Sequence, residues 1–144
     1  MRTSLHNPVF AATLLARRAS YFAARRFNGP FDTPDGFRIE TFQELIAYWS
    51  FFVEREGWSP EWINYVKSEP EPVVFDVGAN AGVFTHLVWR LNPKAVIFSF
   101  DPLPRMADKI SSWQQRTGAN ATIMNLAVSD RSGSAKHDDA GRHF

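Results

Sequence analysis

From position 73 onward, short apolar runs alternate with stretches in which apolar residues recur at helical spacing. The stretch Val73–Phe75 is short and continuously apolar, which is typical of a strand that a parallel sheet buries on both faces, and Ala95–Phe100, apolar apart from Ser99, is predicted to be a second such strand. A third strand is predicted from Thr122 to Leu126. Between the strands, apolar residues recur at helical intervals in two stripes: Val83, Phe84, Leu87, Val88 and Leu91, then Met106, Ile110 and Trp113. This alternation predicts an α/β fold with three parallel strands.

The beginning of the chain has a different, mainly helical pattern. Apolar residues at near-helical spacing predict an amphipathic helix within residues 9–27, which the breaker cluster Asn28-Gly29-Pro30 ends. Pro34-Asp35-Gly36 then predicts the turn of a short hairpin.

Two further helices are predicted before the first parallel strand. One runs from about Phe42 to Glu54 and begins with the capping-box spacing of Thr41 and Glu44. A shorter one starts at Ser59-Pro60, and the charged, proline-broken stretch from residue 68 to 72 indicates a boundary. We therefore expect a mainly helical N-terminal segment with a hairpin over residues 1–70, and an incomplete Rossmann-like domain over residues 71–144.

Composition narrows the possible functions. Hydrophobic residues make up 44% of the chain, which is enough for a core, and no apolar run is long enough to cross a bilayer. The 16 basic and 15 acidic residues leave a net charge of +1, so no global field attracts nucleic acid. Cysteine is absent, which excludes disulfides and thiolate metal sites and favours a cytoplasmic location. Arginine pairs near the N-terminus are interpreted as a solvated helix face rather than a targeting signal. The sequence does not define an oligomeric state.

The segment from Asp76 to Gly82 contains the residues most indicative of function. Gly78 and Gly82 remove side chains where the first strand turns into a helix, so that a ligand can approach the backbone closely. Ligands of open α/β sheets bind at this carboxyl end of the strands. Asp101 follows the second strand and is positioned to accept hydrogen bonds from ribose hydroxyls.

The charge of this segment separates two ligand classes. A dinucleotide site is expected to have the spacing G-x-G-x-x-G, whereas Gly78 and Gly82 have the spacing G-x-x-x-G. Asp76 would repel a pyrophosphate by about 1 kcal/mol or more, and it would attract the cationic amino group of a methionine moiety. The residues therefore favour S-adenosylmethionine over NAD.

Three motifs together resemble the FkbM-type methyltransferase family. They are VVFDVGANAGVFT at residues 73–85, FSFDP at 98–102 and NLAVSD at 125–130. The resemblance implies a Rossmann-like methyltransferase that transfers a methyl group to the oxygen of a sugar or another small metabolite. It also implies S-adenosylmethionine as the cofactor. The family more often has glutamate at the position of Asp101.

The resemblance assigns roles to individual residues. It implies that the methionine end of the cofactor is lined by Asp76, Gly78, Ala79, Asn80 and Gly82. It also implies that Asp101 takes the ribose and that Asn125–Ala127 lie near the adenine, while no catalytic base is identified. The N-terminal helical segment and its hairpin are expected to cap the pocket.

The resemblance extends only to about Gly133. Similar proteins continue with further strands and a D-x-E-G segment on the substrate side, and nothing like it occurs before Phe144. We therefore expect a truncated fold in which Val73–Val77 forms an unpaired edge and the chain is poorly stable. An inactive remnant, an interaction module and an NAD-binding Rossmann protein stay open as alternatives.

Other conspicuous residues have simpler interpretations. Asp101 could simply form an Asx turn before Pro102, and Asn125 could simply belong to a turn. Asp76 could simply act as a hydrogen-bond acceptor within the protein. His86 is expected to be a packed or surface histidine rather than a catalytic one. The irregular spacing of His137, Asp138, Asp139 and His143 favours a solvated tail over a metal site. Core packing is expected for the aromatic residues Trp49, Phe51, Phe52, Trp58 and Trp62.

Overall fold

The computed structural model describes residues 30–133 and has an α/β fold. Three parallel strands, β3 (Val73–Val77), β4 (Val96–Phe100) and β5 (Ala121–Met124), lie side by side in the order β3-β4-β5. Helices α4 (Val83–Leu91) and α5 (Pro104–Thr117) connect them. This alternation confirms the α/β fold predicted from the sequence and is that of a partial Rossmann-like fold.

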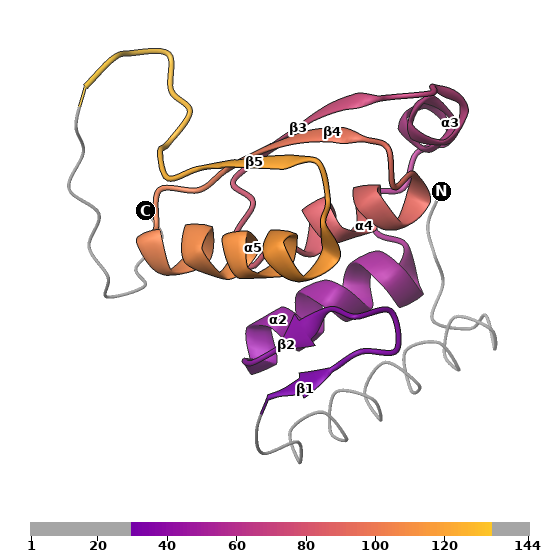
Figure 1. Cartoon of the computed structure of the whole chain (residues 1–144), viewed down its shortest axis with the longest axis horizontal. Helices are drawn as coiled ribbons and strands as arrows, with labels where there is room; N and C mark the ends of the chain where they lie inside the picture. Colours follow the sequence, from indigo (N-terminus) through magenta and orange to yellow (C-terminus); the bar gives the residue numbers. More distant parts are fainter. Residues whose placement is uncertain (1–29, 134–144) are drawn as a thin grey trace, which may run out of the picture.

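The elements before the sheet also agree with the sequence pattern. Strands β1 (Phe31–Asp32) and β2 (Arg38–Ile39) form an antiparallel hairpin, and helix α3 (Pro60–Ser68) precedes β3. Helix α2 (Phe42–Trp49) lies with the hairpin on the far side of α4 and α5 from the sheet (Figure 1). The amphipathic helix predicted within residues 9–27 lies outside the described residues.

Helix α2 begins as the sequence predicts and ends differently. Its capping box is complete, because the Glu44 amide donates to Thr41 Oγ1 at 3.3 Å and the Thr41 amide donates to Glu44 Oε2 at 3.3 Å. The helix then widens into a π-helical turn, η1 (Ser50–Glu54), which ends at Arg55 in the left-handed region, φ 56°. The predicted end at Glu54 is thus correct, but the last turn is not α-helical.

The hydrophobic core joins the early elements to the strand and helix units. Phe37 and Ile39 of the hairpin region are buried in one cluster with Ile110 and Trp113 of α5. Because one cluster contains residues from both parts, the burial of each part depends on the other. A second cluster lies between α3, α4 and β4 and consists of Val66, Val88, Ala95 and Ile97.

A partly buried carboxylate in the hairpin turn connects three elements. Asp35 accepts hydrogen bonds from Thr33 Oγ1 and from the Tyr48 hydroxyl, the latter at 2.8 Å. Its Oδ2 also lies 3.1 Å from His86 Nε2 and 3.7 Å from Arg90 Nε, both on α4. Burial and the contact with Asp35 raise the pKa of Tyr48 to about 12.

His86 is a packed histidine, as expected. Its side chain is fully buried, and Nδ1 accepts a hydrogen bond from Trp113 Nε1 at 3.0 Å. Nδ1 must be unprotonated to accept this bond, so the neutral ring carries its proton on Nε2, facing Asp35. Burial lowers the pKa of His86, and the contact with Asp35 opposes this shift only in part.

One face of the sheet differs from the sequence prediction. β3 was expected to be covered on both faces, but Val73, Phe75 and Val77 are 46%, 62% and 59% exposed. Their neighbours Val74 and Asp76 point to the opposite face, where α4 and α5 pack. A continuously apolar strand is typical of a sheet that is covered on both faces. Within residues 30–133, however, helices cover only one face of this sheet (Figure 1). Within these residues β3 is also an edge strand, as expected.

The exposed face is strongly apolar. The ring of Phe75 stacks on those of Phe98 and Phe100, with centroids 5.2 and 6.3 Å apart. Leu126 and Val128, which follow β5, are also about half exposed. None of the helices described over residues 30–133 has the length and hydrophobicity of a membrane span.

The buried His86 predicts a loss of stability in mild acid. Its pKa is lowered on folding, so below about pH 6.5 the unfolded chain binds a proton that the folded protein does not. The free energy of unfolding should then fall by up to about 1.4 kcal/mol per pH unit as the pH decreases. Urea unfolding between pH 5 and 8 measures this slope. The variant His86→Gln should lose the slope in this window, and a slope unchanged in the variant would contradict the assignment.

The exposed sheet face predicts self-association. Replacing Phe75 by Thr should reduce concentration-dependent association, measured by light scattering, because it removes the most exposed large apolar side chain from this face. The stability cost should stay near 1 kcal/mol, the value of a partly exposed aromatic pair. Ile110→Ala in the core is the control and should cost about 2–5 kcal/mol. Equal losses in the two variants would show that Phe75 is part of the core.

Candidate cofactor site

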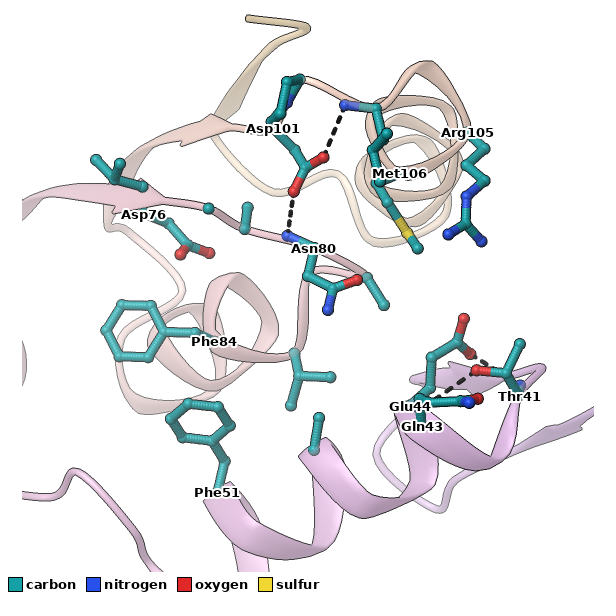
Figure 2. A pocket seen from close by; sticks show the side chains of 18 residues that line it. Thr41, Gln43, Glu44, Phe51, Asp76, Asn80, Phe84, Asp101, Arg105 and Met106 are labelled. Carbon is teal, nitrogen blue, oxygen red and sulfur yellow. Dashed lines mark hydrogen bonds between the residues drawn. The ribbon is translucent and has the colours of Figure 1, made fainter. Parts of the chain in front are cut away.

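A pocket of about 880 Å³ lies at the carboxyl ends of β3 and β4 (Figure 2). One wall consists of the loop after β3, the start of α4 and the loop after β4. Helix α2 and the adjoining Phe51 form the other wall. The pocket therefore occupies the place where open α/β sheets bind ligands. Of the predicted site residues, its lining includes Asp76, Gly78, Ala79, Asn80 and Asp101.

The loop after β3 is fixed by hydrogen bonds to the end of β4. The amides of Gly78 and Ala79 both donate to the carbonyl of Phe100 at 2.9 Å. The next amide, that of Asn80, donates to Asp101 Oδ2 at 2.7 Å. Gly78 and Asn80 have positive φ angles of 76° and 48°, which glycine and asparagine tolerate better than most residues.

Asp76 provides a buried carboxylate beside this loop. It is 7% exposed and accepts a hydrogen bond from Thr85 Oγ1 at 2.5 Å. Because Thr85 donates its only proton to Asp76, the Ser99 hydroxyl 2.8 Å away must be the donor to Thr85. Burial raises the pKa of Asp76, and the hydrogen bond from Thr85 opposes this shift. Among residues 30–133, Asp76 takes part in no ion pair.

Asp101 has backbone partners on both carboxylate oxygens. Oδ2 accepts from the Asn80 amide, and Oδ1 accepts from the Leu103 amide at 2.9 Å. The second bond is the Asx turn that the sequence offered as the simpler interpretation. A carboxylate has about four acceptor positions, so these two bonds leave room for a ligand hydroxyl.

Three predicted site residues do not line the pocket. Gly82 packs against α5, where a Cβ atom would lie 2.9 Å from Ile110 Cγ1. Asn125 donates from Nδ2 to the Asp101 carbonyl at 2.9 Å and so holds the loop after β4 in place. Ala127 lies on the exposed stretch that follows β5. Their direct contact with a cofactor stays a prediction.

The sequence predicted the second wall of the pocket only in part. The N-terminal segment was expected to cap the site, and α2 does line it, but the hairpin packs behind α2 and contributes no lining residue. A capping box shows where a helix starts but not which part of the protein the helix faces. The sequence therefore did not show directly that α2 would line the pocket. The α2 side of the pocket consists of Thr41, Gln43, Glu44, Ala47 and Phe51.

The charged residues in the lining are mostly acidic. Asp76, Asp101 and Glu44 are all buried, while Arg105 at the start of α5 is exposed. Figure 2 shows Arg105 and Met106 on the α5 side, facing Thr41 and Gln43 on α2. Such a lining suits a ligand that carries positive charge and hydroxyl groups.

The structure of residues 30–133 also tests what the sequence predicted for possible metal ligands and for the aromatic residues. Within residues 30–133, no three His, Asp or Glu side chains form a cluster that could hold a metal ion, and the polar tail from His137 to His143 lies outside that range. Phe51, Phe52 and Trp62 pack against the two hydrophobic clusters, which agrees with the expectation of core packing. Trp49 is 37% exposed and donates a hydrogen bond to Glu54 at 3.2 Å.

Comparison with known proteins shows a similarity to a methyltransferase. The chain is 34% identical over 67 residues to the 2-O-methyltransferase NoeI of Sinorhizobium fredii (strain NBRC 101917 / NGR234). The match covers 45% of this chain and 26% of that protein, so the chain spans about a quarter of the length of this relative. No family model matches the chain. The similarity supports a methyltransferase family.

Because Gly82 packs closely against α5, we expect the stability of the protein to be sensitive to substitution at this position. Gly82→Ala should lower stability by about 1–3 kcal/mol, because φ is 82° and the added Cβ would lie 2.9 Å from Ile110 Cγ1. Gly36→Ala is a matched control, since φ is 87° there and nothing lies within 4 Å of the added atom. Chemical unfolding of both variants separates backbone strain from crowding. Equal losses would mean that contact with Ile110 is unimportant.

Proposed function

We propose that this pocket binds S-adenosylmethionine and that the chain provides the cofactor-binding part of an O-methyltransferase. The observation that carries the proposal is Asp76, a carboxylate that is 7% exposed, lines the pocket and has no cationic partner among residues 30–133. Burying such a group is costly unless a positive charge accompanies it. The amino group of the methionine moiety is a cation that would neutralise it.

The start of α4 supports a zwitterionic ligand. Val83, the first residue of this helix, lines the pocket next to Ala81. The first amides of a helix lack partners within it and favour a negative group nearby. A methionine moiety would thus find a counterpart for its amino group in Asp76 and for its carboxylate at the start of α4.

The part of the pocket beside the loop after β4 supports a nucleoside. Asp101 has acceptor capacity for a ribose hydroxyl, and its two backbone bonds fix the orientation of the carboxylate. The neighbouring Leu103 and Met106 provide an apolar surface for the base. A dinucleotide fits less well, because its diphosphate would lie near Asp76 and Asp101, two buried carboxylates that have no cationic partner among residues 30–133.

The proposed reaction transfers a methyl group to a hydroxyl oxygen. When bound, S-adenosylmethionine would supply an electrophilic methyl group on its sulfonium. The new carbon–oxygen bond would replace the carbon–sulfur bond and leave S-adenosylhomocysteine. The hydroxyl proton leaves to a base or to solvent, and the rate depends mostly on alignment of the reacting atoms. The name of the similar protein, a 2-O-methyltransferase, supports an oxygen acceptor. We propose a sugar or another small metabolite as this acceptor.

Replacing the key carboxylate tests the proposal. Asp76→Asn should weaken binding of S-adenosylmethionine by about tenfold or more, because the amide keeps the shape but removes the charge that faces the amino group. Calorimetric titration measures the affinity, and Asp108→Asn, on the exposed side of α5, is the matched control. Tighter binding of NAD than of S-adenosylmethionine to the unaltered protein would overturn the assignment.

The same titration has an expected pH dependence. Burial raises the pKa of Asp76, so the free site takes up a proton at a higher pH than an ordinary aspartate does. Affinity should therefore decrease as the pH falls through this raised pKa, since the protonated carboxyl no longer attracts a cation. In Asp76→Asn this decrease should disappear.

A further inference from the structure

The two walls of the pocket are joined by an ion pair that the proposed function does not use. Lys109 Nζ, on α5, lies 2.8 Å from Glu44 Oε2 and 3.1 Å from Glu40 Oε2. Glu44 belongs to the first turn of α2, and Glu40 precedes the Thr41 cap. The contact thus connects the beginning of α2 directly to the middle of α5.

This ion pair is largely removed from solvent. The side chains of Lys109 and Glu44 are 13% and 7% exposed. Glu44 Oε2 also accepts the amides of Glu40 at 2.7 Å and of Thr41 at 3.3 Å, so one oxygen both completes the capping box and receives the lysine. Removing the lysine would leave a buried carboxylate without its cation, which is strongly unfavourable.

The position of Lys109 relates the pair to the nucleoside end of the pocket. On a helix, residues three and four apart share a face, and Lys109 follows Met106 and Arg105 at these intervals. Both of these residues line the pocket near Asp101. Figure 2 shows that they lie across the pocket from Gln43 and Glu44. The ion pair therefore fixes how far apart the two walls stand at this end.

We propose that Lys109 is a positioning residue: by holding Glu44, it keeps the start of α2 against α5 and closes the nucleoside end of the cofactor pocket. This inference rests on the proposed binding of S-adenosylmethionine. It makes residues 41–47 of the N-terminal part a wall of the cofactor site. Lys109 itself does not touch the ligand, since it does not line the pocket.

The test compares ligand binding with the mobility of α2. Lys109→Met should weaken binding of S-adenosylhomocysteine, measured by calorimetry, by about tenfold or more, the scale expected for breaking a buried ion pair. It should also speed hydrogen exchange of the amides of α2. Lys109→Arg retains the charge and should restore both readouts in large part. Lys94→Met, at an exposed lysine outside the pocket, should change neither.

Two further variants separate the possible outcomes. Asp76→Asn should weaken binding without changing exchange in α2, because it acts at the methionine end. If Lys109→Met does not fold, Lys109→Met combined with Glu44→Gln removes both charges, and it should fold and still bind weakly. Wild-type affinity in a folded variant that lacks the ion pair would overturn the inference, as would unchanged exchange in α2. Failure of the unaltered protein to bind S-adenosylhomocysteine would instead overturn the proposed function, and with it the ligand role of Lys109.

Discussion

The arrangement of the site depends on the way the end of β4 holds the loop that follows β3. Three successive amides, those of residues 78, 79 and 80, are bound by the Phe100 carbonyl and the Asp101 carboxylate. These bonds hold the loop in a sharp turn with positive φ angles, and the loop residues still line the pocket. They also bring the end of β3, with Asp76, close to Asp101. The two carboxylates therefore have a fixed relation before any ligand arrives, which reduces the entropy that binding must overcome.

The N-terminal elements are as much a part of this arrangement as the sheet. Asp35 connects the hairpin turn to α2 through Tyr48 and to α4 through His86. Lys109 connects the other end of α2 to α5. Each contact includes a carboxylate whose side chain is at most 13% exposed, and such a group is costly to leave without partners. Helix α2 is thus held at two places, and the pocket wall that it forms has a defined position.

Much of this fold could be predicted from local patterns. The capping box of Thr41 and Glu44 and the left-handed Gly118 that ends α5 each depend on a few neighbouring residues, which the sequence shows directly. The loop residues of the candidate site were found in the same way. The wall formed by α2, the partners of Asp35 and the role of Lys109 depend on contacts between distant residues. Periodicity also could not show that Phe75 would be exposed, because a strand pattern records hydrophobicity and not whether a covering layer is present.

The strand order has a consequence for how the protein assembles. Each parallel strand pairs with the next one along the chain, so each pairing spans one intervening helix. A pairing of this kind has to close its connection before the strands contribute to stability, and the loop-closure entropy of that step slows folding. The outer edge of β3 takes no part in these connections. The loops around the pocket consequently depend on the pairing of β3 with β4 and do not depend on pairing at that edge.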